Sequence, residues 1–250
     1  MKKNFLFILI DNFKTLIFAL LIAILIRSLF MQPFYIPSSS MEPTLLVGDR
    51  IFASKYSYGY SKHSFPFSPP FSNKRFFSKE PIRGDLVIFK TPADNRTDYI
   101  KRLIGLPGDS IQFINGEIFL NEEPIKRERI TSTSEIRCGP TSLDINLYLE
   151  TLPNGKSYKA AYIKKGTMLN SDKYVVPKNH YFLLGDNRDC SQDSRFLSSV
   201  GYVKNINLVG KAKVIFFSND TIKSSFLKFW NWGDSLRLNR TFKLLWQNNH

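Results

Sequence analysis

Three consecutive serines, residues 38–40, are the first in the chain whose type and setting could do chemistry. Prolines flank them at positions 37 and 43. Proline fixes its own φ at about −65° and pushes the preceding residue toward an extended backbone, so Ile36 and Glu42 are restricted and Ser40 is held on a constrained turn. Taken alone, the stretch is also typical of a Ser/Pro linker, because both residues are common in turns for local reasons.

Lys101 is the second candidate, because it lies in an otherwise apolar segment, residues 99–104. In a strand, Lys101 shares a face with Tyr99 and Leu103, while Arg102 points to the other face. Burial would lower the lysine pKa from about 10.4 and favour the neutral amine, which can act as a general base toward a serine hydroxyl. The alternative is that Lys101 and Arg102 are an ordinary basic pair on an edge strand or on a solvated face of the sheet.

The third candidate is the polar stretch 185–195, which follows the apolar run 181–184 and alternates Asp, Arg and Ser. Such side chains are costly to bury unless they are paired, so the stretch predicts a dense network of hydrogen bonds and ion pairs. A polar loop with local turns is the alternative.

The histidines and cysteines of the sequence do not indicate a second catalytic site or a metal site. None of the three histidines, His63, His180 and His250, lies in a Ser- or Asp-containing pattern that would support a Ser–His–Asp triad. Cys138 and Cys190 are far apart in sequence and lack the companions of a zinc site, and whether they pair depends on the fold. We therefore expect no metal and no cofactor.

The apolar run 15–31 must position these residues relative to a membrane. It is about the minimum length for a bilayer-spanning helix, and Arg27 near its far end can reach the interface. No small-x-small site follows it, so we expect an uncleaved anchor. Lys2, Lys3 and Lys14 favour a cytoplasmic N-terminus with the remaining chain translocated.

The formal net charge of +14 allows nucleic-acid binding, attraction to an anionic membrane, or no specific partner. No zinc-finger, RRM or P-loop spacing is present, so we favour the membrane. An aromatic, proline-rich loop at 65–77, with Lys74, Arg75 and Lys79, is interpreted either as a loop folded on the core or as one that dips into lipid headgroups. The aromatic and basic tail, residues 226–246, could form an amphipathic helix that either lies on a membrane or docks on the domain, more readily after Gly233 than across it.

Apolar and alternating runs predict strands through most of the remaining chain, and Asn115-Gly116 between two such runs is a strong hairpin signal. The expected fold class is mainly β: an antiparallel sheet catalytic domain with an inserted smaller β subdomain, plus one N-terminal transmembrane helix. The expected strands lie within 45–60, 85–89, 99–105, 110–114, 117–120, 181–184 and 209–217. The expected units are the N-terminus and anchor at 1–31, the catalytic domain at 32–225 with a polar, irregular insertion at about 126–173, and the tail at 226–250.

Taken together, residues 38–44, 83–85, 99–102, 106–109 and 185–195 resemble the conserved boxes of bacterial type I signal (leader) peptidases in order and separation. The resemblance extends over about residues 32–217. It implies a membrane-anchored serine endopeptidase that removes N-terminal signal peptides from exported preproteins after small residues of the Ala-x-Ala type. It also implies action at the outer face of the cytoplasmic membrane, in contact with phospholipid, and we expect a monomer that binds no nucleic acid.

The resemblance implies a role for each matching residue. Ser40 would be the nucleophile and Lys101 the general base, while the Ser38 hydroxyl and the Ser40 backbone N–H would form the oxyanion hole. Ser191 would orient the lysine. The supporting network would comprise Asp186, Arg188, Asp193, Arg195 and Arg102, and the small apolar pockets would involve Phe34, Ile36 and Ile100.

The chain departs from the family pattern at a few positions. Cys190 stands beside Ser191 where an asparagine is usual, and Ser39 stands where glycine is common. Two other functions remain to be weighed: a self-cleaving repressor-type protease, which would carry a DNA-binding module instead of the apolar run, and a non-enzymatic envelope protein that binds lipid.

Overall fold

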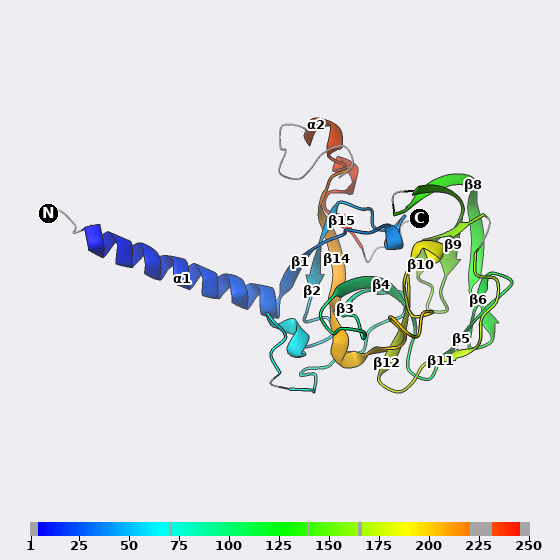
Figure 1. Ribbon diagram of the computed structural model, residues 1–250, viewed down its shortest axis with the longest axis horizontal. Coiled ribbons are helices and arrows are strands. Elements are labelled where there is room, and N and C mark those ends of the chain that lie inside the picture. Colours follow the sequence, from blue (N-terminus) through cyan, green and yellow to red (C-terminus); the bar gives the residue numbers. More distant parts are fainter. Residues whose placement is uncertain (1–4, 71, 140, 165–166, 221–231, 246–250) are drawn as a thin grey trace.

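The computed structural model describes residues 5–70, 72–139, 141–164, 167–220 and 232–245. One long helix, α1 (Phe5–Leu29), projects from a domain built of strands (Figure 1). Its segment Phe7–Leu29 is apolar and long enough to cross a membrane. Its described side chains are exposed up to Arg27, and Ser28 is the first one that is buried, where the helix meets the domain. The helix is longer than the run predicted from the sequence, and Met31, expected inside the anchor, begins the first strand.

The largest sheet has the strand order β1-β2-β14-β3-β4-β12-β13, with β15 beside β14. Its strands are β1 (Met31–Tyr35), β2 (Asp49–Ser54), β3 (Leu86–Lys90), β4 (Asp98–Gly105), β12 (His180–Leu184), β13 (Val203–Lys204), β14 (Leu208–Ser218) and β15 (Lys243–Leu244). The ladders among the described residues are antiparallel, which agrees with the predicted class.

A second, four-stranded sheet has the order β11-β5-β6-β7. It comprises β5 (Ser110–Ile114), β6 (Glu117–Leu120), β7 (Glu123–Pro124) and β11 (Tyr174–Val175). Asn115 and Gly116 join β5 to β6 with φ of 49° and 76°. Both turn residues thus adopt the positive φ of a tight hairpin turn, as their sequence predicted.

The insertion is more regular than its polar composition indicated. It forms a three-stranded sheet of β8 (Lys126–Cys138), β9 (Thr141–Thr151) and β10 (Ser157–Ile163). The β8–β9 hairpin lies on the side of the domain away from α1 (Figure 1). Polar residues are tolerated in such strands because one face of a hairpin can remain in water.

The predicted helix after Gly233 is wrong for the part of the tail that is described. Helix α2 (Trp232–Ser235) ends after one turn, and residues 243–244 form β15, which pairs with Val214 and Ile215. An edge strand satisfies its backbone groups on the existing sheet, which an isolated short helix cannot do as well. The rest of the predicted helix, at 226–231 and 246, lies outside the described residues.

Candidate active site

Ser40 lies on a single turn of 3-10 helix, Ser39–Met41, in the connection between β1 and β2. Met41 and Leu45 are fully buried and anchor this connection in the core. The Ser40 carbonyl accepts a hydrogen bond from the backbone N–H of Asn187 at 3.2 Å. Residues 38–41, called the serine turn below, are therefore held in place by two kinds of contact. Apolar packing anchors the segment that follows, and the polar stretch 185–195 donates a backbone hydrogen bond to it.

Lys101 lies on β4, in the interior of the largest sheet between β3 and β12. Its side chain is 3% exposed, and its Nζ donates to Ser40 Oγ at 2.6 Å. Burial lowers the pKa of Lys101 to about 8, against the opposing pull of the carboxylates of Asp193 and Asp186. The structure thus brings together a serine and a lysine whose proton is unusually easy to remove.

Ser38 stands beside the pair, with its Oγ 3.4 Å from Ser40 Oγ. Phe34, Ile36 and Ile100 line a cavity of about 390 Å³ that also reaches Ser38, Ser40 and Lys101. All three predicted pocket residues are therefore adjacent to the two candidate reacting groups. Three further lining residues, none of which the sequence assigned to the pocket, are Tyr99, Gln192 and Cys190.

Arg102 points away from Lys101 and is also buried, at 6% exposure. Its guanidinium forms a two-point ion pair with Asp186, with Nε–Oδ1 and Nη2–Oδ2 distances of 2.7 Å each. Thr44 Oγ1 donates to the same carboxylate at 2.5 Å, which links this pair to the segment just after Ser40. The two faces of β4 therefore carry different chemistry: an amine near the serine, and a neutralised ion pair behind it.

Two further pairs complete the network predicted for residues 185–195. Asp193 binds the guanidinium of Arg195 at 2.8 and 2.9 Å and also accepts the backbone N–H of Gly185 at 3.0 Å. Arg188 is almost fully buried and pairs with Glu150 of β9 at 2.8 and 2.7 Å. These pairs satisfy charges that would otherwise be costly to bury.

Sequence reasoning missed Glu150, because it lies in the region expected to be irregular. Tyr158 and Tyr162 of β10 each donate their hydroxyl to its carboxylate. Arg188 holds the pKa of Glu150 below its usual value despite the strong opposing effect of burial. A glutamate ending an alternating run, Leu147-Tyr148-Leu149-Glu150, was the signal that could have identified it.

Ser191 is buried near the site, but its hydroxyl has no hydrogen-bond partner among the described residues. The structure therefore does not join Ser191 to Lys101. The hydroxyl packs against Gly185, where an added Cβ would lie 2.2 Å from Ser191 Oγ and 2.5 Å from the Ser40 carbonyl oxygen. Only glycine allows the two segments to approach this closely.

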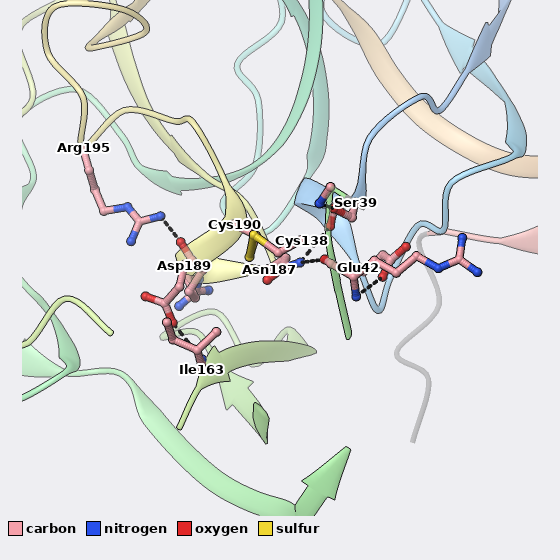
Figure 2. Close-up of a disulfide and its surroundings, with 11 residues drawn as sticks. Ser39, Glu42, Cys138, Ile163, Asn187, Asp189, Cys190 and Arg195 are labelled. Carbon is pink, nitrogen blue, oxygen red and sulfur yellow. Dashed lines mark hydrogen bonds between the residues drawn. A yellow bond between two sulfur atoms is a disulfide. The ribbon is translucent and has the colours of Figure 1, made fainter. Parts of the chain in front are cut away.

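A disulfide joins Cys138, at the tip of the β8–β9 hairpin, to Cys190, the residue before Ser191 (Figure 2). The sequence had left this pairing open. Between the two sulfurs and the serine turn lies Asn187, whose Nδ2 donates to the carbonyls of Ser39 at 3.1 Å and Arg137 at 2.9 Å. The hairpin tip, the polar stretch and the serine turn are thereby connected by one disulfide and one side-chain amide.

The two histidines that the structure describes, His63 and His180, do not form a triad with Ser40. His63 Nδ1 shares a hydrogen bond with Ser68 Oγ, and His180 Nδ1 lies 2.8 Å from the carbonyl of Lys178. His250 lies outside the described residues. Among the described residues, no cluster of histidine, cysteine and carboxylate side chains could hold a metal ion.

The chain is similar in sequence to known proteins of one family. The family model described as "Signal peptidase, peptidase S26" matches residues 9–217. A signal peptidase I of Rickettsia typhi is 43% identical over 254 residues, covering 94% of each chain, and one of Rickettsia akari is 44% identical over 248 residues, covering 92% of this chain and 90% of that protein. A solved signal peptidase I from Enterococcus faecalis is 26% identical and covers 53% of this chain and 97% of its own, with a TM-score of 0.32, too low to support an argument about fold.

Proposed function

Because this chain belongs to the signal peptidase family, peptidase S26, we propose that it cleaves signal peptides with Ser40 as nucleophile and Lys101 as general base. Family membership makes it a signal peptidase, a serine endopeptidase that removes signal peptides. The observation that carries the proposed dyad is the 2.6 Å separation of Lys101 Nζ and Ser40 Oγ on a lysine that is 3% exposed. Neither a DNA-binding module nor a purely lipid-binding role is needed to account for this arrangement.

The first step is attack by Ser40 Oγ on the carbonyl carbon of the scissile peptide bond. The neutral amine of Lys101 takes the hydroxyl proton as the new C–O bond forms. The protonated lysine then gives this proton to the departing amine nitrogen as the C–N bond breaks. In the second half of the reaction, the neutral Lys101 takes a proton from water as the water oxygen bonds to the acyl carbon. The ester C–O bond to Ser40 then breaks, the protonated lysine returns the proton to Ser40 Oγ, and the acyl part leaves as a carboxylic acid. A pKa of about 8 supports this role, because a useful fraction of the amine is neutral near neutral pH.

The negative charge that develops on the scissile carbonyl oxygen needs hydrogen-bond donors. We assign this oxyanion hole to the Ser38 hydroxyl and the Ser40 backbone N–H. The 3.4 Å approach of the Ser38 and Ser40 hydroxyls supports the assignment, because a carbonyl attacked by Ser40 would lie beside Ser38. Donors already in place need no reorganisation during the reaction.

The residues before the cleavage point would occupy the cavity lined by Phe34, Ile36 and Ile100. Its volume of about 390 Å³ would have to hold several side chains and part of the backbone of a bound peptide. Small apolar side chains would fill it without displacing the core, which supports a preference of the Ala-x-Ala type. Larger side chains would force the packed walls apart.

The helix Phe7–Leu29 supports a membrane-anchored protein. We propose a cytoplasmic N-terminus and a catalytic domain on the outer face of the cytoplasmic membrane, acting as a monomer on preproteins. The disulfide between Cys138 and Cys190 supports this side, because disulfides persist mainly in oxidising compartments.

The test uses the full chain in detergent with a preprotein whose signal peptide ends in Ala-x-Ala. Ser40→Ala and Lys101→Ala should each abolish processing while the far-ultraviolet circular dichroism stays that of the wild type. Lys101→Arg should also fail, because a guanidinium remains charged. Processing retained by Lys101→Ala would refute the dyad.

A further inference from the structure

A second cavity, of about 350 Å³, lies where α1 meets the β-domain. It is lined by Arg27 from the last turns of α1, by Lys55 just after β2, and by His63 and Phe67 from the aromatic loop. Arg96, from the β3–β4 connection, completes the wall. No step of the proposed peptidase reaction uses this cavity.

The charge of the cavity is unbalanced. Four cationic side chains line it, against the single carboxylate of Asp98. Lys90 already neutralises that carboxylate at 2.9 Å. Among the residues that the structure describes, the other three cations, Arg27, Lys55 and Arg96, form no ion pair. The cavity therefore has a positive excess suited to an anion.

Two buried polar groups at the cavity are incompletely satisfied. The Lys55 side chain is 2% exposed, and it donates only to the backbone carbonyl of Ser64, without a carboxylate. Burial, and then the nearby charge of Arg27, lower the pKa of Lys55 to about 8. His63 is buried as well, and its Nε2 has no hydrogen-bond partner in the part of the chain that the structure describes. A bound anion would supply the missing partner to both side chains.

The position of the cavity indicates where the anion would come from. The apolar segment of α1 ends at Leu29, so Arg27 lies at the depth where lipid headgroups meet the hydrocarbon. Tyr60 Oη donates to the carbonyl of Leu29 at 2.8 Å, and the Lys55 backbone N–H donates to that of Phe30 at 3.0 Å. The end of the helix is therefore fixed against the cavity.

The aromatic loop adds an apolar contact beside the charged one. Phe67 is fully exposed at the rim of the cavity, and Phe77 is 82% exposed. Arg75 turns inward and donates to the carbonyls of Gly59 and Leu208, as the interpretation of a loop folded on the core requires. Arg75 thus fixes the loop to the domain by hydrogen bonds, while Phe67 and Phe77 are exposed to the surroundings. Exposed aromatic side chains of this kind are typical of a membrane interface.

We propose that this cavity binds the phosphate of an anionic phospholipid headgroup. Arg27, Lys55 and Arg96 would surround the phosphate oxygens, and His63 Nε2 would donate the remaining hydrogen bond. Phe67 would lie among the upper acyl chains. Such a lipid would fix the height and tilt of the catalytic domain over the bilayer surface.

The experiment measures lipid retention rather than peptidase activity. The full chain is reconstituted in phosphatidylcholine vesicles with or without phosphatidylglycerol, extracted in mild detergent, and examined by native mass spectrometry. One phosphatidylglycerol should remain bound to the wild type and equally to Ser40→Ala, so loss of the proposed peptidase chemistry would not affect this readout. Arg27→Gln and Arg96→Gln, at exposed positions that need not disturb folding, should each weaken retention about tenfold or more.

Lys74→Gln is the matched control, because it removes one positive charge at an exposed position of the aromatic loop, outside the cavity lining. It should leave retention unchanged. Equal weakening by Lys74→Gln and Arg27→Gln would show general surface attraction and overturn the site. Retention of phosphatidylcholine as firmly as phosphatidylglycerol would also overturn it.

A second arm separates a lipid from free phosphate. Inorganic phosphate is titrated against the detergent-solubilised chain without phosphatidylglycerol, and the NMR signals of His63 are followed. Under the proposal, inorganic phosphate shifts these signals only weakly and does not displace the bound lipid. Tight binding of inorganic phosphate that displaces phosphatidylglycerol would overturn the assignment to a lipid headgroup.

Discussion

Lys101 Nζ lies 2.6 Å from Ser40 Oγ although 61 positions separate the two residues in the chain. The amine is supplied by an interior strand and the hydroxyl by a turn that is packed above it. This contact affects both catalysis and stability. Lys101 is buried beside the serine and forms no ion pair with a carboxylate among the described residues, so its charged form is unfavourable.

The pH dependence of cleavage should follow the titration of Lys101. Burial lowers its pKa to about 8, and only the neutral amine can accept the Ser40 proton. We therefore expect kcat/KM to rise about tenfold per pH unit below this value and to level off above it. Initial rates on a signal-peptide substrate across this range test the prediction. A flat profile through pH about 8 would contradict it.

Lys101→Met should abolish cleavage and make the protein more stable. A pKa lowered from 10.5 to about 8 corresponds to about 3 kcal/mol of unfavourable burial, at about 1.36 kcal/mol per pH unit. Methionine fills similar space without a charge, so the free energy of unfolding should increase by up to about this amount. Denaturant unfolding below pH 8 measures it. An unchanged or lower stability would mean that the lysine is not desolvated.

Glu150→Gln should be strongly destabilising, because it leaves the guanidinium of Arg188 buried without a counter-charge. Breaking a buried pair in this way costs about 3–5 kcal/mol. Glu128→Gln is the control, since the Lys126–Glu128 pair is exposed on both sides and should contribute less than about 1 kcal/mol. Thermal unfolding of the two variants compares them directly, and equal losses would argue against the role of the buried pair.

Opening the Cys138–Cys190 disulfide should lower kcat more than it raises KM. The bond holds the hairpin tip beside Asn187, which in turn contacts both Ser39 and Ser40 through their carbonyls. Reduction of the wild type with a dithiol and the double change Cys138→Ser with Cys190→Ser should have the same effect.

Two controls accompany the disulfide experiment. The reductant should not change the rate of the double variant, and Ser142→Ala, at an exposed site of the same hairpin, should behave as the wild type. Full activity after complete reduction, verified by thiol titration, would show that the serine turn keeps its position without the bond.

The sequence by itself determined the elements with strong local signals and most of the residues to which we assign chemistry. Apolar runs and turn residues act locally, so they identified the anchor, the strand bearing Lys101 and the Asn115–Gly116 hairpin. The three motifs also identified Ser40, Lys101 and the polar stretch 185–195 as one candidate site. These signals can be recognised without the fold, because the backbone preferences and the chemistry of a side chain depend on the local sequence and not on tertiary contacts.

Only the tertiary structure decided which distant groups meet. The partner of Arg188 proved to be Glu150, Cys138 proved to pair with Cys190, and Ser191 formed no hydrogen bond to Lys101. Residues 243–244 of the tail form a strand because the edge of β14 beyond Lys211 is not paired with β3. Such contacts depend on how sheets twist and pack against one another, and a short polar segment is compatible with many partners until that packing selects one.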